Sequence, residues 1–335
     1  MSTDESAAAV PFEFGEPVSK KFGNALGYSA DEGLQTAMRV SMLLGMPLLL
    51  TGEPGCGKTS AADWLALQLH FQGHAVHDKP MVHNVKSTSS GRELLYEFDE
   101  IARFRDAQKG QEKPPHEYLA LNALGLAIAL TAPPEAALGE SGLTYRQFIV
   151  TASRERIAEN RFLSRHVVLI DELDKAPRDT PNDLLSEIQE MRFYVRELGT
   201  WVEGGGDLRP AVVITSNSEK SLPEPFLRRC VFHHIDSPDD KRRKVIIEMR
   251  NHPFARRGLL YDGAMAYFEE VHGNLGRAPG TAELLAWLTA LENSVASAAR
   301  SGAPTPSLRH MIEPTIGIFA KTDDDIASAK QLIPG

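Results

Sequence analysis

The sequence predicts an α/β fold in which a parallel sheet flanked by helices is followed by a small all-helical domain. Short apolar runs, typical of buried parallel strands, alternate with segments whose apolar residues recur at helical spacing. Strands that alternate with helices predict a parallel sheet with right-handed crossovers. After Asp236-Ser237-Pro238 the strand patterns stop and only helical patterns follow. The 335 residues are enough for two domains of ordinary size.

The first domain is expected to contain four strands, over 46–51, 81–85, 166–170 and 211–215. The first of them is a continuous apolar run that ends at Gly52, as a central parallel strand feeding a turn does. Helices are expected over 30–44, from Thr59 onward, and over 181–191.

The stretch from about 91 to 160 is too long for an ordinary connection between two strands. It carries helical patterns over 92–108 and 118–130, separated by a proline-rich break. We therefore interpret it as an insertion into the α/β domain, which we expect to span 26–237. A polar arm, 1–25, precedes that domain.

The remaining residues, 238–335, are assigned to the helical domain. Its helices are expected near 239–250, 261–272, 281–299, 307–319 and 323–333. No internal repeat or low-complexity tract is present in the sequence.

The composition is that of an ordinary globular protein, with 42% apolar and 24% charged residues. No run approaches the roughly 18 apolar residues that a membrane helix needs. The first residues are acidic and lead into no signal-peptide core. The only cysteines are Cys56 and Cys230, which fits a reducing compartment. We therefore expect a cytoplasmic protein with no membrane contact.

The net charge of −9 provides no overall basic field for duplex DNA, so nucleic acid is not the expected partner. The basic run 241–244 is typical of the solvated face of a helix. A local nucleic-acid stripe there is the alternative interpretation.

A phosphate-binding loop is predicted at Gly52-Glu53-Pro54-Gly55-Cys56-Gly57-Lys58-Thr59. Its glycines permit backbone angles that aim successive N–H groups at phosphate oxygens, at the N-terminus of a helix. Lys58 is expected to reach the β- and γ-phosphates of ATP, and Thr59 to give a hydroxyl to Mg²⁺. Ser60 follows in the same turn and is assigned to the nucleotide site. The loop follows a predicted strand and opens a predicted helix, which is the required context; a coincidental glycine turn is the alternative.

Two carboxylates, Asp171 and Glu172, end the apolar strand 166–170. They are expected to face a cation or water, because an unpaired buried charge is costly. Asp171 is therefore assigned to the Mg²⁺ shell, and Glu172 to the general base that activates water. A solvated acidic turn is the alternative.

Asn217 ends the next strand candidate, and its amide both donates and accepts hydrogen bonds without adding charge. It is expected to position the lytic water or to sense the γ-phosphate, although asparagine is also common in turns. Two adjacent arginines, Arg228 and Arg229, follow a short helix. A planar cation there can stabilise charge on a γ-phosphate bound by a neighbouring subunit. A surface ion pair is the alternative interpretation.

These segments, in this order, resemble those of the AAA+ ATPases over about residues 25–335. The specific signatures are LLLTGEPG at 48–55 and VLIDELDKA at 168–176. Within the superfamily the sequence is most similar to the MoxR-type, dynein-related branch. The resemblance implies a P-loop NTPase sheet, the AAA+ core, followed by a helical lid, in a homo-oligomeric and generally hexameric ring.

The resemblance also implies roles for the residues already singled out. It makes 52–59 the Walker A motif, Asp171 and Glu172 the Walker B carboxylates, and Asn217 sensor 1. Arg229 matches the arginine finger, with Arg228 as its neighbour.

Two further assignments follow from the resemblance. Arg277 is the candidate for sensor 2, although it lies a few residues earlier than family members place it. The segment 192–202, where strand alternation follows the helix 181–191, is assigned to the family's helix-2 insert, a hairpin that points into the pore of the ring. A solvent-exposed hairpin is the alternative.

The implied function is Mg²⁺-dependent ATP hydrolysis that remodels a partner protein complex. The resemblance also implies a chaperone that acts together with a protein containing a von Willebrand factor A domain. The loop 86–91 lacks the aromatic-apolar-glycine motif of polypeptide-threading relatives, and the insertion is atypical, so both argue against threading. The alternatives are a nucleic-acid-directed motor of a restriction or defence system, a small-molecule P-loop kinase, and a binding module that does not hydrolyse ATP.

Cys56 lies inside the phosphate loop, at the N-terminus of the predicted helix. A thiol in that position can have a lowered pKa, which makes redox control one interpretation. A small residue that merely fits the loop is the simpler one.

Overall fold

The structure, a computed structural model, describes residues 27–75, 77–217 and 222–334. They form two compact units, the first running to Arg250 with residues 280–282 added, and the second made of 251–279 and the rest of the chain from 283. The expected arm 1–25 lies outside the described residues. No described helix is long and apolar enough to cross a bilayer.

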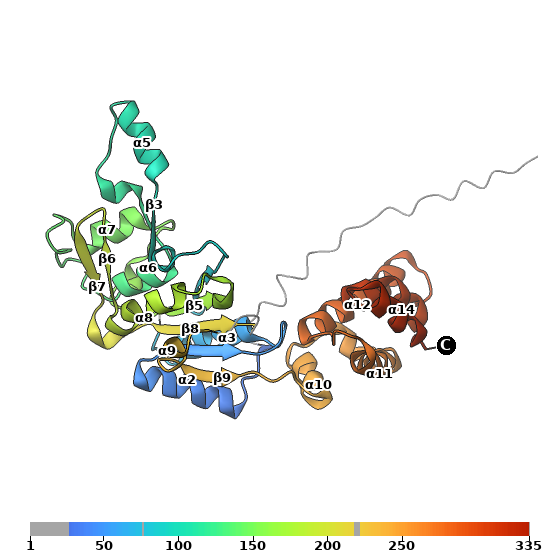
Figure 1. The fold of residues 1–335 in the computed structure, drawn as a ribbon. Coiled ribbons are helices and arrows are strands. Elements are labelled where there is room, and N and C mark those ends of the chain that lie inside the picture. Colours follow the sequence, from blue (N-terminus) through green and yellow to red (C-terminus); the bar gives the residue numbers. More distant parts are fainter. Residues whose placement is uncertain (1–26, 76, 218–221, 335) are drawn as a thin grey trace, which may run out of the picture. The chain divides into compact units, whose positions relative to one another are not determined.

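The first unit is built on a five-stranded sheet in the order β2-β5-β8-β1-β9, in which every neighbouring pair is parallel (Figure 1). This confirms the predicted parallel α/β sheet. The strands are β1 (Leu48–Thr51), β2 (Met81–Asn84), β5 (Val167–Asp171), β8 (Ala211–Ser216) and β9 (Val231–His234).

The strand β9 was not expected from the sequence. It lies at the edge of the sheet, where its residues are alternately half-buried and exposed. A strand in that position does not need a continuous apolar run, and its sequence, Val-Phe-His-His, has none. The pattern that predicts the central strands is therefore missing here.

Different helices cover the two faces of the sheet. Since alternate strand residues point to opposite faces, Leu48 and Leu50 join one apolar core with α2 (Glu32–Leu44) and α3 (Lys58–Phe71). Leu49 joins the other core, together with α8 (Thr180–Glu190) and helices of the insertion. Both faces are thus buried, which explains the continuous apolar strands.

The insertion does not form the two continuous helices expected over 92–108 and 118–130. The chain instead makes two strands that pair antiparallel, with a helix between them that has no buried residue (Figure 1). Tyr96 and Leu121 lie opposite each other in this pairing, and both are buried. These apolar positions therefore belong to paired strands and not to continuous helices. The elements are α4 (Gly91–Leu95), β3 (Tyr96–Phe98), α5 (Glu100–Gln108), the 3₁₀ helix η2 (Pro115–Tyr118), β4 (Leu119–Leu121), α6 (Ala123–Ala129), α7 (Tyr145–Ala152) and η3 (Glu159–Arg161).

A hairpin of β6 (Arg192–Val195) and β7 (Thr200–Glu203) follows α8. Its inner face is buried, whereas Tyr194 and Trp201 on its outer face are exposed. The strand alternation expected there is therefore present. A second antiparallel pair, β3 and β4, lies in the insertion that follows β2.

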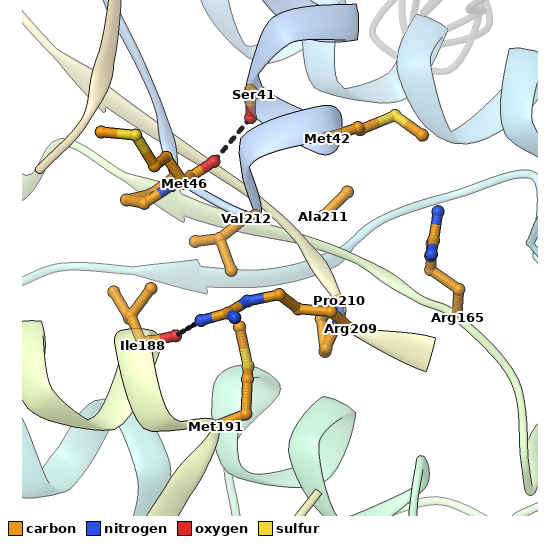
Figure 2. Close-up of a pocket in the computed structure, with 12 residues that line it drawn as sticks. Ser41, Met42, Met46, Arg165, Ile188, Met191, Arg209, Pro210, Ala211 and Val212 are labelled. Carbon is orange, nitrogen blue, oxygen red and sulfur yellow. Dashed lines mark hydrogen bonds between the residues drawn. The ribbon is translucent and has the colours of Figure 1, made fainter. Parts of the chain in front are cut away.

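Arg209 fixes the end of α8 at the edge of the sheet opposite the phosphate loop. It lines a cavity of about 30 Å³ and donates a hydrogen bond to the carbonyl oxygen of Ile188 (Figure 2). It also donates one to the carbonyl oxygen of Gln189. These carbonyls lie in the last turn of α8, where a cation interacts favourably with the helix. Burial lowers the pKa of the Arg209 guanidinium.

The second unit is all-helical, as expected. Its core contains the aromatic residues Tyr267, Phe268, Trp287 and Phe319, whose rings are in mutual contact. Its elements are η6 (Pro253–Arg256), α11 (Leu259–Asn274), most of α12 (Thr281–Ser301), α13 (Leu308–Ile312), η7 (Glu313–Ile318) and α14 (Asp323–Gln331).

The helix α10 (Asp240–Met249) belongs to the first unit, although we expected the helical domain to begin at residue 238. Arg242, in α10, donates to a side-chain oxygen of Asp31 and to the carbonyl oxygen of Ser29. These contacts join α10 to the start of α2.

Candidate active site

The expected site residues meet at the carboxyl edge of the parallel sheet. The strand β1 leads into the loop 52–57, β5 ends at Asp171, and β8 is followed by Asn217. Because β5, β8 and β1 are adjacent and parallel, these three strand ends lie side by side. This edge is where open α/β sheets bind their ligands.

Two glycines of the loop are required by its backbone. Gly52 has φ +144°, and a Cβ there would collide with the carbonyl oxygen of Ile235. Gly57 has φ +103° and immediately precedes α3, and a Cβ there would lie 3.0 Å from the ring of Tyr28. The loop therefore turns tightly into the N-terminus of α3, which favours anions.

Lys58 is buried, at 7% exposure, and its ammonium is folded into the loop. Its Nζ donates to the carbonyl oxygens of Gly52, at 2.8 Å, and Glu53, at 3.0 Å. The positive charge thus lies at the centre of the loop that would receive the phosphates.

Thr59 and Asp171 face each other across the site. The Thr59 hydroxyl lies 3.4 Å from both carboxylate oxygens of Asp171. Hydroxyl and carboxylate oxygens are the hard ligands that Mg²⁺ prefers, usually together with waters and substrate phosphates. The residues present therefore fit a Mg²⁺ ion that also contacts a bound triphosphate.

Thr215 connects Asp171 and Glu172, a role that sequence reasoning missed. It is completely buried. Its Oγ1 accepts a hydrogen bond from the backbone N–H of Glu172, at 2.8 Å, and donates one to Asp171 Oδ1, at 2.5 Å. The available signal was a hydroxyl residue directly after the apolar run 211–214, near the end of the strand.

The Glu172 carboxylate is held by two side chains. Asn217 Nδ2 donates to Oε1, at 3.1 Å, and Lys175 Nζ donates to Oε2, at 2.5 Å. Glu172 also has φ +60°, which is uncommon for a residue other than glycine and is typical of functional positions when the surroundings enforce it. The structure thus brings Asn217 and Glu172 together, and adds Lys175, which sequence reasoning did not single out.

Arg228 and Arg229 lie at the amino ends of the parallel strands, opposite the carboxyl ends where the phosphate loop lies. They are separated by one residue from β9, whose first residue, Val231, is level with the first residue of β1. The phosphate loop lies beyond the far end of β1, which is about 10 Å long. Arg228 is exposed and paired with Glu224, whereas for the exposed Arg229 no ion pair is found within the described residues.

The other expected site residues have more varied surroundings. Ser237 donates a hydrogen bond to the Glu53 carboxylate, at 2.5 Å, and Pro54 is exposed. Burial raises the pKa of the Cys56 thiol, contrary to the lowering expected at a helix N-terminus. Cys56 is therefore better interpreted as a small residue that fits the loop than as a reactive thiol.

Ser60 lies in the first turn of α3, half-buried. Arg277 belongs to the second unit, where it is exposed just before α12. It therefore lies in a different unit from the phosphate loop.

Comparison with known families agrees with this arrangement. The family model described as "ATPase family associated with various cellular activities (AAA)" matches residues 48–238. The match runs from β1 through β5, which leads into both carboxylates, to the segment after β9, and covers more than half of the chain. No significant match is found among curated proteins. With its phosphate loop, paired carboxylates and parallel sheet in these positions, the chain belongs to the AAA family of ATPases.

Proposed function

We propose that the protein is a ring-forming, Mg²⁺-dependent ATPase of the MoxR-type, dynein-related branch, which remodels a partner protein complex. The observation that carries the catalytic part is the meeting of Lys58, Thr59, Asp171, Glu172 and Asn217 at one edge of the sheet. The proposed domains are the AAA+ core with its insertion and the helical lid.

The proposed reaction is hydrolysis of the bond between the β- and γ-phosphates. Glu172 takes a proton from water, the water oxygen attacks the γ-phosphorus, and the bond to the bridging oxygen breaks to give ADP and phosphate. Lys58 balances the charge of the phosphates, and Asn217 orients the water. Thr59 and Asp171 would hold Mg²⁺, which neutralises charge that develops on the phosphate oxygens.

The position of Arg229 supports a ring. This arginine is exposed and lies at the edge of the sheet opposite its own phosphate loop. We propose that it completes the site of an adjacent subunit, as head-to-tail contacts in a closed ring allow, and that the ring is a hexamer. Arg228, paired with Glu224, is then the neighbour rather than the finger. Arg277 is proposed as sensor 2.

The partner is proposed to be a protein, possessing or associated with a von Willebrand factor A domain. Support comes from the resemblance in sequence and from the net charge of −9. The basic run 241–244 does not form a free nucleic-acid stripe, because Arg242 is paired with Asp31, and Arg243 is buried and paired with Asp240. These pairs count against a DNA-directed motor.

The proposal is tested with Glu172→Gln, which removes the base but keeps the size of the side chain. We expect unchanged affinity for ATP, a turnover lowered by about 10²- to 10⁴-fold, and ATP-dependent assembly into rings of uniform mass. Mass photometry with and without ATP measures the assembly. Turnover equal to that of the wild type would refute the base, and a monomer in saturating ATP would refute the ring.

A further inference from the structure

We propose that Lys175 is a positioning residue that restrains the general base Glu172 in the absence of nucleotide, and so sets the basal rate of hydrolysis. The inference rests on the proposed function of Glu172. It concerns a contact that the signature motifs do not explain: the ion pair of 2.5 Å between Lys175 Nζ and Glu172 Oε2.

The local backbone brings the lysine to the base. Glu172 has φ +60° and is followed by the 3₁₀ helix η4 (Leu173–Lys175), in which the Lys175 N–H donates to the carbonyl oxygen of Glu172. In a 3₁₀ turn, side chains three residues apart lie on the same side. The Lys175 side chain therefore lies against the Glu172 carboxylate.

Two buried residues anchor this turn. Leu173 is fully buried, and Asp174 is 4% exposed. The Asp174 carboxylate accepts a hydrogen bond from the backbone N–H of Asn217. The turn is thus fixed to the end of β8, and the position of Lys175 follows from the packing.

Both carboxylate oxygens of Glu172 already have a protein donor, Asn217 on Oε1 and Lys175 on Oε2. A general base must have an oxygen within hydrogen-bond reach of the water it deprotonates. The described arrangement is therefore a restrained state of the base.

Lys175 is the donor that can leave. Asn217 is bonded through its backbone as well as its side chain, so its amide is held at the end of the strand. The Lys175 ammonium is at the end of a flexible four-carbon stem, and its side chain is 44% exposed. Opening the ion pair therefore does not require the backbone of the turn to move.

The test compares Lys175→Met with Lys175→Arg in the full-length protein. Methionine keeps the length and removes the charge, whereas arginine keeps the ion pair. We expect Lys175→Met to raise the kcat for ATP about two- to five-fold, as expected when an exposed ion pair no longer has to open. Lys175→Arg should retain the wild-type kcat, and the Kd for ATP should be the same in all three proteins.

Lys113→Met is the matched control, because Lys113 forms an exposed ion pair with Glu117 in the insertion, 3.6 Å long. It should leave kcat unchanged. A kcat of Lys175→Met equal to or below that of Lys175→Arg, with circular dichroism unchanged, would overturn the restraint. If Lys175→Met fails to fold, the ratio of kcat between Lys175→Arg and Lys175→Gln gives the same comparison. If Glu172→Gln keeps the wild-type turnover, the result contradicts the proposed function of Glu172 and not the restraint by Lys175.

Discussion

Replacing Thr215 with valine removes a buried hydroxyl that joins Asp171 to the backbone of Glu172. Valine has the same shape, so the change leaves packing almost intact. It leaves the Glu172 N–H without its acceptor and Asp171 without a charge-assisted hydrogen bond. An unsatisfied buried donor costs about 1 to 3 kcal/mol, and a hydrogen bond to a charged group is worth a similar amount. Because Asp171 is only partly buried, water can replace part of its lost hydrogen bond, and we expect the free energy of unfolding of the first unit to fall by roughly 2 to 4 kcal/mol.

For a unit of this size, each kcal/mol lowers the Tm by about 2 to 4 °C, so the expected shift is roughly 5 to 15 °C. Thermal unfolding followed by circular dichroism measures it, and an ATPase assay at a temperature below both transitions should show a lower kcat. Thr215→Ser, which keeps the hydroxyl, is the matched control and should retain most of the activity. If Thr215→Val melts and hydrolyses ATP as Thr215→Ser does, the hydroxyl does not hold the two carboxylates in place.

Two other predictions concern the phosphate loop and the pH dependence of stability. Gly52→Ala should reduce the affinity for ATP about 5- to 150-fold, since strain at such a position costs about 1 to 3 kcal/mol. Gly73→Ala, at φ +72° but with open space around it, should bind ATP normally in isothermal titration calorimetry. Burial lowers the pKa of His166 to about 4, so the folded state favours the neutral imidazole. The contribution of His166 to the stability is therefore complete above the unfolded pKa of 6.5, and it is lost as the pH falls from 6.5 toward 4. The free energy of unfolding should therefore fall by roughly 3 kcal/mol more in the wild type than in His166→Gln between pH 7 and pH 4, and equal losses in urea denaturation would contradict this.

The central strands and the phosphate loop could be predicted from the sequence because their physical constraints are local. A strand buried on both faces needs a continuous apolar run, and 46–51 and 166–170 have one. A loop that binds phosphate needs glycines at set positions before a helix. The carboxylates and Asn217 follow from the strands, since the carboxyl ends of parallel neighbours meet at one edge.

Elements that depend on contacts distant in sequence could not be predicted. The segment 92–108 has helical spacing, but Tyr96 pairs with Leu121, so the helix is broken. The strand β9 is defined by pairing with β1 at the sheet edge. The roles of Thr215 and Lys175 depend on where their side chains meet Asp171 and Glu172, which no spacing rule specifies.

The most direct test of a site shared between subunits mixes two inactive variants, Arg229→Ala and Glu172→Gln. Each variant alone should have almost no turnover. In a mixed ring, an Arg229→Ala subunit keeps its own Glu172 and receives Arg229 from a Glu172→Gln neighbour, so about a quarter of the interfaces should be intact if the subunits mix at random. We predict that an equimolar mixture recovers a clear fraction of the wild-type ATPase rate. A mixture no more active than either variant, although mixed rings form, would contradict action of Arg229 across the subunit interface.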